Sequence, residues 1–206
     1  MYKLHGYQTQ NNKKVLYVVE ELGLPYEFNF VNLFKGEHKT EAFLKMNPLG
    51  KVPVLEHDDK YLFESGAICR YLANQESNSL FPEDKFQRAL VDQWMEFFTN
   101  HLGFWLNTLF YQKVIKKMAN LGEPNSEKCA EANKFLQPQL KVLDGDLEKG
   151  KYIVGNELTI ADLVAFAYIE QMDALEMSLS DYPNVLKWKE EISQRDSIKK
   201  ANAHFN

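Results

Sequence analysis

The stretch that most constrains the fold is residues 47–68, which read NPLGKVPVLEHDDKYLFESGAI. Its pattern predicts strands over 52–55 and 61–63, joined by the polar turn 57–60 and followed at once by a helix. Pro53 nevertheless falls inside the first predicted strand, where a proline cannot donate to a sheet ladder. We therefore expect the free edge of this strand to bind a ligand.

The first ~80 residues mix strand and helix signals in an order that restricts the topology. Strand-like alternation is seen over residues 2–6 and 26–30, while helical spacing is seen over 15–22 and, more briefly, over 43–46. Together with the hairpin and its helix, the order is βαβ, helix, ββ, helix. This order predicts a small mixed sheet with helices on its faces, the thioredoxin-like arrangement.

The remaining sequence is helical and is separated from the first part by polar residues. We predict an α/β, thioredoxin-like N-terminal domain over residues 1–76, a linker over 77–87, and an all-α helical bundle domain over 88–206. Apolar residues in the segment 90–114 cover more than one helical face. Such a helix is expected to be buried on two sides, which favours a homodimer.

Composition narrows the classes of function. The net charge is −5 and no basic stripe stands out, so nucleic acid is not an expected partner. No apolar run approaches the ~20 residues that a membrane span needs, and the N-terminal residues lack the layout of a secretory signal. Cys69 and Cys129 are far apart and offer neither a disulfide framework nor a metal cluster. We therefore expect a cytoplasmic protein with no metal and no membrane partner.

The hairpin and the helix after it also suggest a ligand. If the bond before Pro53 is cis, the N–H and C=O of Val52 turn outward and can pair with an extended peptide. Glu64 and Ser65 follow at a predicted helix N-terminus, where backbone N–H groups and the helix dipole favour a carboxylate. Glu64 could also accept an ammonium group. These features together describe a site for a small peptide with amino-acid-like ends.

At this point three stretches carry a resemblance to a known family. Residues 47–73, NPLGKVPVLEHDDKYLFESGAICRYLA, resemble the glutathione-binding half of cytosolic glutathione transferases. Residues 155–166, GNELTIADLVAF, are similar to the capping motif of that family's helical domain, with Thr159 as the cap and Asp162 reaching back to it. Residues 36–48, GEHKTEAFLKMNP, resemble the phi-class and the fungal nitrogen-regulator-like (nu-type) branches.

The resemblance extends from Tyr2 to about Trp188 and implies the glutathione transferase fold, a homodimer and glutathione as a substrate. It implies that Pro53 is the family's cis-proline, that Val52 pairs with the cysteinyl backbone of glutathione, and that Glu64 and Ser65 hold the γ-glutamyl group. Residues expected near the glycine carboxylate or the glutamyl end are His38, Lys39 and Lys51.

The chemistry of such a site requires the glutathione thiolate, and a hydroxyl that donates to the sulfur favours it. Counting back from Val15, Thr9 matches the position of the serine in serine-type transferases, and Asn11 fits an asparagine of the nu-type branch. Thr9 is the first candidate for this hydrogen bond and Asn11 the second. Tyr7 is the rival, because other classes use a tyrosine at the end of the first strand. For Thr9 a plain capping contact is the alternative.

The electrophile is expected between Thr9 and the first long helix of the second domain. Its pocket is predicted to involve Phe104, Thr108 and Tyr111, because an apolar pocket with few polar groups suits apolar electrophiles. Bundle core or dimer interface is the alternative for each of them.

The resemblance implies a glutathione transferase (EC 2.5.1.18 type) that adds glutathione to small hydrophobic electrophiles. Two alternatives stay open: a glutathione-dependent disulfide or peroxide reductase in the same site, and a non-catalytic glutathione-binding regulatory module. Comparing the turnover of a model electrophile with the turnover of a mixed disulfide separates the transferase from the reductase.

Overall fold

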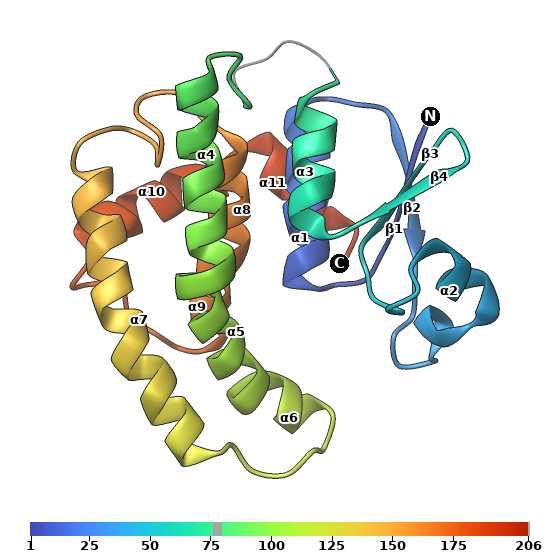
Figure 1. Ribbon diagram of the computed structural model, residues 1–206. Helices are drawn as coiled ribbons and strands as arrows, with labels where there is room; N and C mark the ends of the chain where they lie inside the picture. Colours follow the sequence, from blue (N-terminus) through green and yellow to red (C-terminus); the bar gives the residue numbers. More distant parts are fainter. Residues whose placement is uncertain (76–79, 206) are drawn as a thin grey trace. The chain divides into compact units, whose positions relative to one another are not determined.

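The computed structural model describes residues 1–75 and 80–205, so the expected linker 77–87 lies partly outside the described residues. The chain divides into two compact units. Unit 1 consists of residues 1–78 with 195–206, and unit 2 consists of residues 79–194. Figure 1 shows the elements of both units.

Unit 1 is built on a four-stranded mixed sheet with the strand order β2-β1-β3-β4. β1 pairs with β2 in parallel, while β1 with β3 and β3 with β4 pair antiparallel. The predicted thioredoxin-like arrangement is therefore confirmed. The strands are β1 (Tyr2–Gly6), β2 (Tyr26–Phe30), β3 (Val54–His57) and β4 (Lys60–Phe63).

Helices cover both faces of this sheet (Figure 1). On one face α1 packs against α3 and α11. On the other face, Phe43 of α2 belongs to an apolar cluster with Val31 and Val54. Successive residues of a strand point to opposite faces, so β3 contributes Val54 to the α2 side and the neighbouring, buried Leu55 to the opposite side. The helical elements of this unit are α1 (Gln10–Glu21), η1 (Glu37–Lys39), α2 (Glu41–Met46), α3 (Ser65–Ala73) and α11 (Asp196–Ala203).

The hairpin differs from the expectation in two respects. β3 begins at Val54 rather than at residue 52, because Pro53 has no N–H with which to join the ladder. β3 also lies between β1 and β4 and has no free edge, so a ligand cannot pair beside it as we expected of this strand. Val52 and Pro53 lie just before the ladder and are not part of β3. The turn is formed by Asp58 and Asp59, whose φ angles of 49° and 59° suit a two-residue hairpin.

Unit 2 is helical. Its first part runs from Lys85 to Met118 as consecutive helical segments, two of them π-helical. The elements are α4 (Lys85–Phe97), η2 (Phe98–Leu102), α5 (Gly103–Phe110), η3 (Tyr111–Ile115), α6 (Lys116–Met118), α7 (Ser126–Leu147), α8 (Ile160–Ile169), α9 (Gln171–Ala174) and α10 (Pro183–Ser193).

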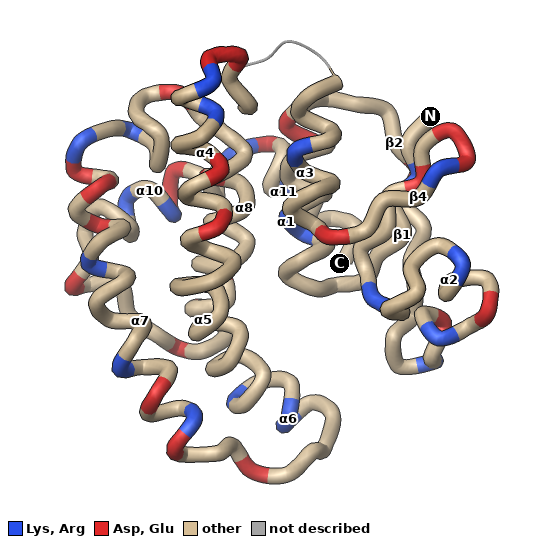
Figure 2. Tube along the Cα trace, viewed as in Figure 1, with Lys and Arg blue, Asp and Glu red and all other residues tan. Residues whose placement is uncertain are grey.

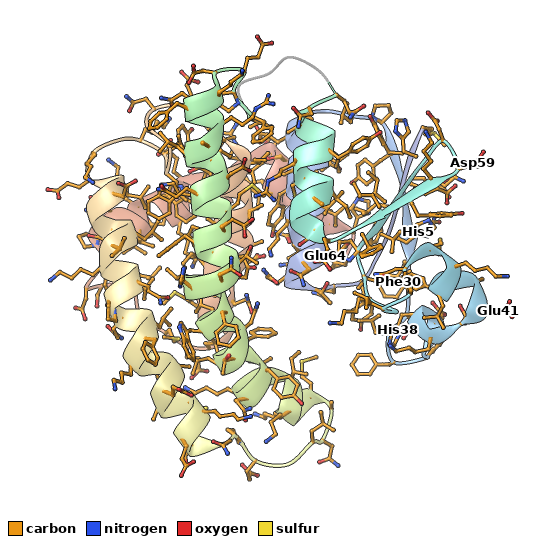
Figure 3. All side chains as sticks on the ribbon, in the orientation of Figure 1. His5, Phe30, His38, Glu41, Asp59 and Glu64 are labelled. Carbon is orange, nitrogen blue, oxygen red and sulfur yellow. The ribbon has the colours of Figure 1, made fainter. Side chains whose placement is uncertain are left out.

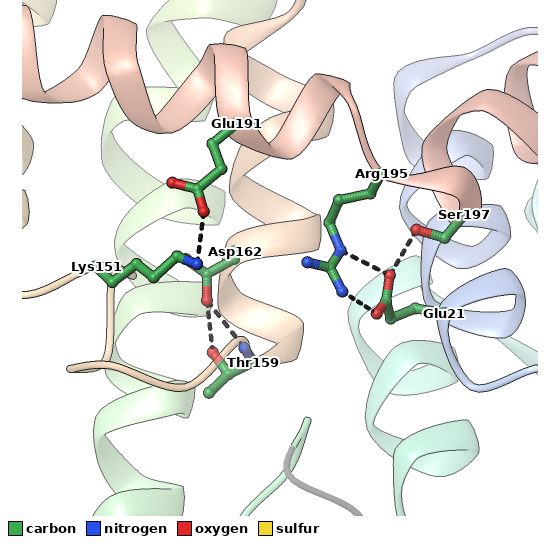
Figure 4. Close-up of polar contacts among 7 residues, drawn as sticks. All are labelled: Glu21, Lys151, Thr159, Asp162, Glu191, Arg195 and Ser197. Atoms are coloured by element: carbon green, nitrogen blue, oxygen red, sulfur yellow. Dashed lines mark hydrogen bonds and ion pairs between the residues drawn. The ribbon is translucent and has the colours of Figure 1, made fainter.

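All residues of α8 are buried, and this helix packs against α4, α5 and α10. Its start carries the predicted capping box (Figure 4). The backbone N–H and the hydroxyl of Thr159 both donate to Asp162 Oδ2, at 3.0 and 3.1 Å. Asp162 Oδ1 also accepts from the backbone of Ile153 at 2.9 Å and from Trp188 Nε1 at 3.0 Å. One buried carboxylate therefore joins a loop, a helix start and α10.

The C-terminal end of the chain differs from the expected domain 88–206. Arg195 and Ser197 both bind Glu21 of α1, so α11 is part of unit 1 (Figure 4).

Acidic and basic residues are interspersed along the helices of unit 2 (Figure 2). Within residues 1–75 and 80–205, no helix is both long and apolar enough to cross a membrane. The same residues contain no cluster of three or more His, Cys, Asp or Glu placed to hold a metal ion.

Candidate active site

The start of α1 is capped by Thr9. Its backbone is extended (φ −123°, ψ 151°), and its Oγ1 accepts the backbone N–H of Asn12 at 3.3 Å. The capping contact that was the alternative reading of Thr9 is therefore present. It does not use up the hydroxyl, because an oxygen that accepts one hydrogen bond still has its own proton to donate. Thr9 can cap the helix and donate to a ligand atom at the same time.

Asn11 connects the start of α1 with the start of α3. Its Oδ1 accepts from Lys14 Nζ at 3.0 Å and from Ser65 Oγ at 3.4 Å. Asn11 is exposed, whereas Lys14 and Ser65 are buried. Asn11, predicted to contact the thiol, and Ser65, predicted to hold the γ-glutamyl group, are thus in direct contact.

Glu64 and Ser65 lie where β4 passes into α3, and Figure 3 shows Glu64 at this junction. Glu64 has a φ of 71° and ψ of 110° and is the residue before the first helical residue, Ser65. A non-glycine residue at positive φ costs on the order of 1–3 kcal/mol, and such residues cluster at functional sites. The exposed carboxylate of Glu64 and the N–H groups of the first turn of α3 can together accept an ammonium and bind a carboxylate.

The segment before β3 is organised by a residue that the sequence did not single out. The peptide bond between Val52 and Pro53 is cis. Asn47 is buried, and its Nδ2 donates to the carbonyl of Lys51 at 2.8 Å, while its Oδ1 accepts from the N–H of Leu49 at 3.0 Å. Asn47 thereby fixes the conformation of the loop that leads to Val52 and Pro53. The Asn-Pro pair at residues 47–48 is the turn signal that could have identified it.

His38 and Lys39 lie against the same loop. A Cβ added to Gly50, which has a φ of +58°, would lie 2.8 Å from the carbonyl oxygen of His38 and 2.9 Å from Lys39 Nζ. Both residues are therefore next to the residue that precedes Lys51. The side chains of Lys39 and Lys51 are exposed, and Figure 3 shows His38, which lies in η1 just before α2. This corner of unit 1 carries two exposed cations that can bind an anionic group.

Tyr7 directly follows β1 and packs with aromatic side chains. Its ring centroid lies 5.1 Å from that of Phe30 and 6.1 Å from that of Phe34. Both phenylalanines are exposed. These contacts place the ring of Tyr7 beside the end of β2, where it packs with aromatic side chains.

Lys14 is, after Asn47, the second residue near the site that the sequence did not single out. Its side chain is only 3% exposed, and burial lowers its pKa to about 7, although nearby Cys69 and Glu64 act in the opposite direction. The signal was available: Lys14 is four residues before Val18, on the apolar face of the predicted helix. Cys69 is fully buried, and burial raises the pKa of its thiol to about 12, as befits a small core residue.

The residues predicted to line the electrophile pocket all lie in unit 2. Phe104 and Tyr111 are exposed, and Thr108 is half-buried with its hydroxyl donating to the Phe104 carbonyl at 2.9 Å. Their spacing of four and seven residues places them on one helical face. The buried side chains of the same segment, Leu102, Leu106 and Leu109, form the core face. That the exposed face lines a pocket with Thr9 stays a prediction.

Comparison with protein families gives matches to both parts of the chain. The family model described as "Glutathione S-transferase, N-terminal domain" matches residues 1–74. The model described as "Glutathione S-transferase, C-terminal domain" matches residues 104–196. The two matches together cover more than half of the sequence and contain all the predicted site residues.

Curated proteins and solved structures agree with these matches. "Probable glutathione S-transferase GSTF2" of Oryza sativa subsp. japonica is 34% identical over 96% of this chain and 94% of its own. "Glutathione S-transferase hmp2" of Hypomyces subiculosus is 32% identical over 98% of this chain and 97% of its own. A solved structure of "glutathione S-transferase-I bound with the ligand lactoylglutathione" superposes with a TM-score of 0.90 at 33% identity, covering 98% of both chains.

Proposed function

The chain belongs to the glutathione S-transferase family and is a glutathione transferase (EC 2.5.1.18 type), and we propose that its glutathione site is formed by the residues gathered in unit 1. In this proposal Thr9 donates its hydroxyl to the glutathione sulfur, with Asn11 as the second donor. Val52, next to Pro53, pairs with the cysteinyl backbone. Glu64 accepts the ammonium of the γ-glutamyl group.

Both carboxylates of glutathione are bound by positively charged or N–H-donating groups of unit 1. The γ-glutamyl carboxylate lies at the N-terminus of α3, where Ser65 and the first backbone N–H groups donate to it. The glycine carboxylate faces His38, Lys39 and Lys51, of which the two lysines are exposed cations. The apolar electrophile contacts Phe104, Thr108 and Tyr111.

The observation that carries this proposal is the hydrogen bond of Ser65 to Asn11. It supports a single site because it joins the α3 start, where a carboxylate is favoured, to the α1 start, where Thr9 has a hydroxyl proton to donate. A thiolate stabilised by hydrogen bonds is the nucleophile that glutathione transfer requires.

The decisive experiment is an ultraviolet titration of the glutathione thiol in the complex, combined with the initial rate of conjugation to a model aromatic halide. We expect the pKa of the bound thiol to lie below the ~8.5 of a free cysteine thiol and the conjugation to saturate in glutathione. An undepressed thiol pKa with tight binding would contradict the proposed roles of Thr9 and Asn11. It would support the binding-module reading of this site.

Reduction of disulfides or peroxides by the same thiolate is a second activity that the site chemistry allows. No cysteine lies between Tyr7 and Val15 to form a mixed disulfide with glutathione, so conjugation is the reaction that the residues favour. Turnover of a glutathione mixed disulfide faster than that of the model electrophile would reverse this order.

We also propose that the protein is a cytoplasmic homodimer. Exposed apolar side chains of unit 2 outside the proposed electrophile contacts include Phe135 and Val142. A segment with apolar residues on more than one face is typical of a helix that contacts a second subunit. Sedimentation equilibrium over a range of concentrations measures the mass directly. A mass equal to that of one chain at all concentrations would exclude the dimer.

A further inference from the structure

Lys14 is buried one helical turn from Asn11, at the start of α1. Its Nζ donates to Asn11 Oδ1 at 3.0 Å, and its side chain is only 3% exposed. A buried lysine is rare unless it has a partner, because taking the ammonium out of water is costly. Asn11 is a partner of this buried lysine, so Lys14 can influence the proposed glutathione site beside it.

The chemistry of a lysine fixes which way the Asn11 carboxamide faces. A protonated lysine has three N–H donors and no acceptor, so the atom of Asn11 that meets Nζ must be the carbonyl oxygen. Ser65 Oγ donates to the same oxygen at 3.4 Å. With its oxygen turned toward two donors of the protein, Asn11 has its NH2 group left to present elsewhere. Asn11 is exposed, so that group is available to a ligand.

We propose that Lys14 is a positioning residue for glutathione transfer, which holds the Asn11 oxygen inward so that the Asn11 amide N–H groups face the glutathione sulfur. This inference rests on the proposed function, because it assumes that glutathione binds beside Asn11. An amide turned the other way would point its oxygen at the sulfur and would oppose the thiolate. The orientation of one carboxamide thus decides whether Asn11 helps or hinders the anion.

Lys14 also keeps this orientation when the ligand arrives. The carboxylate of the γ-glutamyl group competes for the Ser65 hydroxyl, which then no longer donates to Asn11. The bond from Lys14 remains, and because Lys14 is buried, water competes little for it. With its pKa lowered to about 7, Lys14 is protonated below neutral pH and can then only donate to Asn11, whereas at higher pH the neutral amine also has a lone pair and fixes the carboxamide less strictly.

The test compares Lys14→Met, which keeps the length of the side chain without a donor, with Lys14→Arg, which restores donors. Lys189→Met is the matched control, because Lys189 is also largely covered but binds Asp173 of unit 2. We expect Lys14→Met to raise the pKa of the bound glutathione thiol by about one unit, which corresponds to a tenfold loss of thiolate near neutral pH. The dissociation constant for glutathione should change less than threefold, and Lys14→Arg should recover most of the shift.

A double-mutant cycle with Asn11→Ala separates positioning from a general loss of structure. If Lys14 acts through Asn11, Lys14→Met should raise the thiol pKa no further in the Asn11→Ala background. Fully additive shifts, or an unchanged thiol pKa in folded Lys14→Met, would overturn the inference while the proposed function stands. If wild-type protein fails to depress the thiol pKa, the proposed roles of Thr9 and Asn11 fail first, and this inference fails with them.

Discussion

Glu21, the last residue of α1, and Arg195 are linked by two hydrogen bonds although 174 residues separate them. Arg195 Nε and Nη2 donate to the two carboxylate oxygens at 3.0 and 2.5 Å, and Ser197 Oγ adds a third bond at 2.6 Å (Figure 4). Burial alone would raise the pKa of Glu21, but the bonds from Arg195 and Ser197 outweigh it and hold the pKa below its ordinary value. This pair fastens α11 to α1, the helix that Thr9 caps and that carries Asn11.

The Glu21 pair makes part of the stability depend on pH. Because the folded-state pKa of Glu21 is lowered, its contribution is present above the unfolded value of 4.5 and is lost as pH falls through the folded-state pKa. We expect Glu21→Gln to lower the free energy of unfolding at pH 7 by about 1–3 kcal/mol. The deficit relative to wild type should shrink as the pH drops below that value. Urea denaturation at several pH values measures both effects.

Glu41→Gln is the control for this prediction. Glu41 pairs with Lys45 four residues later, and the side chains are 86% and 73% exposed. Exposed pairs contribute about 0–1 kcal/mol at most. Equal losses in the two variants, or a Glu21→Gln deficit that is independent of pH, would contradict the role assigned to the Arg195 contact.

Thr9→Ala should affect both the helix and the thiol. Loss of the cap is expected to lower the free energy of unfolding by about 1 kcal/mol. Loss of the hydroxyl should raise the pKa of the thiol of bound glutathione, with little loss of affinity for glutathione. Thr9→Ser keeps both properties, whereas Thr9→Asp keeps the cap without a proton to donate. Ultraviolet titration of the bound thiol separates the two effects. A thiol pKa that stays put in Thr9→Ala would move the role to Asn11 or Tyr7.

Ser65→Ala should weaken glutathione binding. A hydrogen bond to a charged group is worth about 1–3 kcal/mol, so the dissociation constant should rise roughly 5- to 150-fold. Isothermal titration calorimetry measures this directly. Ser193→Ala provides the matched control, because the Ser193 hydroxyl donates only to a nearby carbonyl, that of Glu190, in unit 2. Equal affinities in wild type and Ser65→Ala would mean that the γ-glutamyl carboxylate is bound elsewhere.

The strand and helix order could be predicted from the sequence because it depends on local patterns. Alternation over residues 2–6 and the spacing of apolar residues after Asn12 are local signals, and so is the capping box of Thr159 and Asp162. The edge status of β3 depends on which strands pair, which a single strand's pattern does not encode. The placement of α11 in unit 1 depends on the Arg195 contact with Glu21, which no local pattern marks.

The same distinction applies to the site. His38, Lys39 and Lys51 could be proposed from a resemblance and lie around Gly50. Lys14 and Asn47 were missed because their importance comes from what they contact, not from their type. A lysine on a helix is normally solvated, but Lys14 is buried on α1, a helix that packs against both α3 and α11. Contacts across 50 or more residues, such as that of Ser65 with Asn11, are invisible to patterns of period two or 3.6.

Phe104→Ala tests the proposed electrophile face. Phe104 is 52% exposed in unit 2 and stands one turn from Thr108 and two turns from Tyr111. If an apolar electrophile contacts it, truncation removes apolar contact worth about 1.5–3 kcal/mol when the ring is fully covered. We therefore expect kcat/KM for an apolar electrophile to fall about tenfold or more, while KM for glutathione remains unchanged.

Phe86→Ala is the matched control, since Phe86 is 70% exposed on α4 of the same unit. It should alter neither constant. A polar electrophile of similar size should lose less than an apolar one in Phe104→Ala, because the ring contributes apolar contact and no hydrogen bond. Sedimentation equilibrium on the same variant decides between the two readings of this face. A loss of dimer mass with unchanged kcat/KM would assign Phe104 to a subunit interface, whereas the reverse result would assign it to the electrophile pocket.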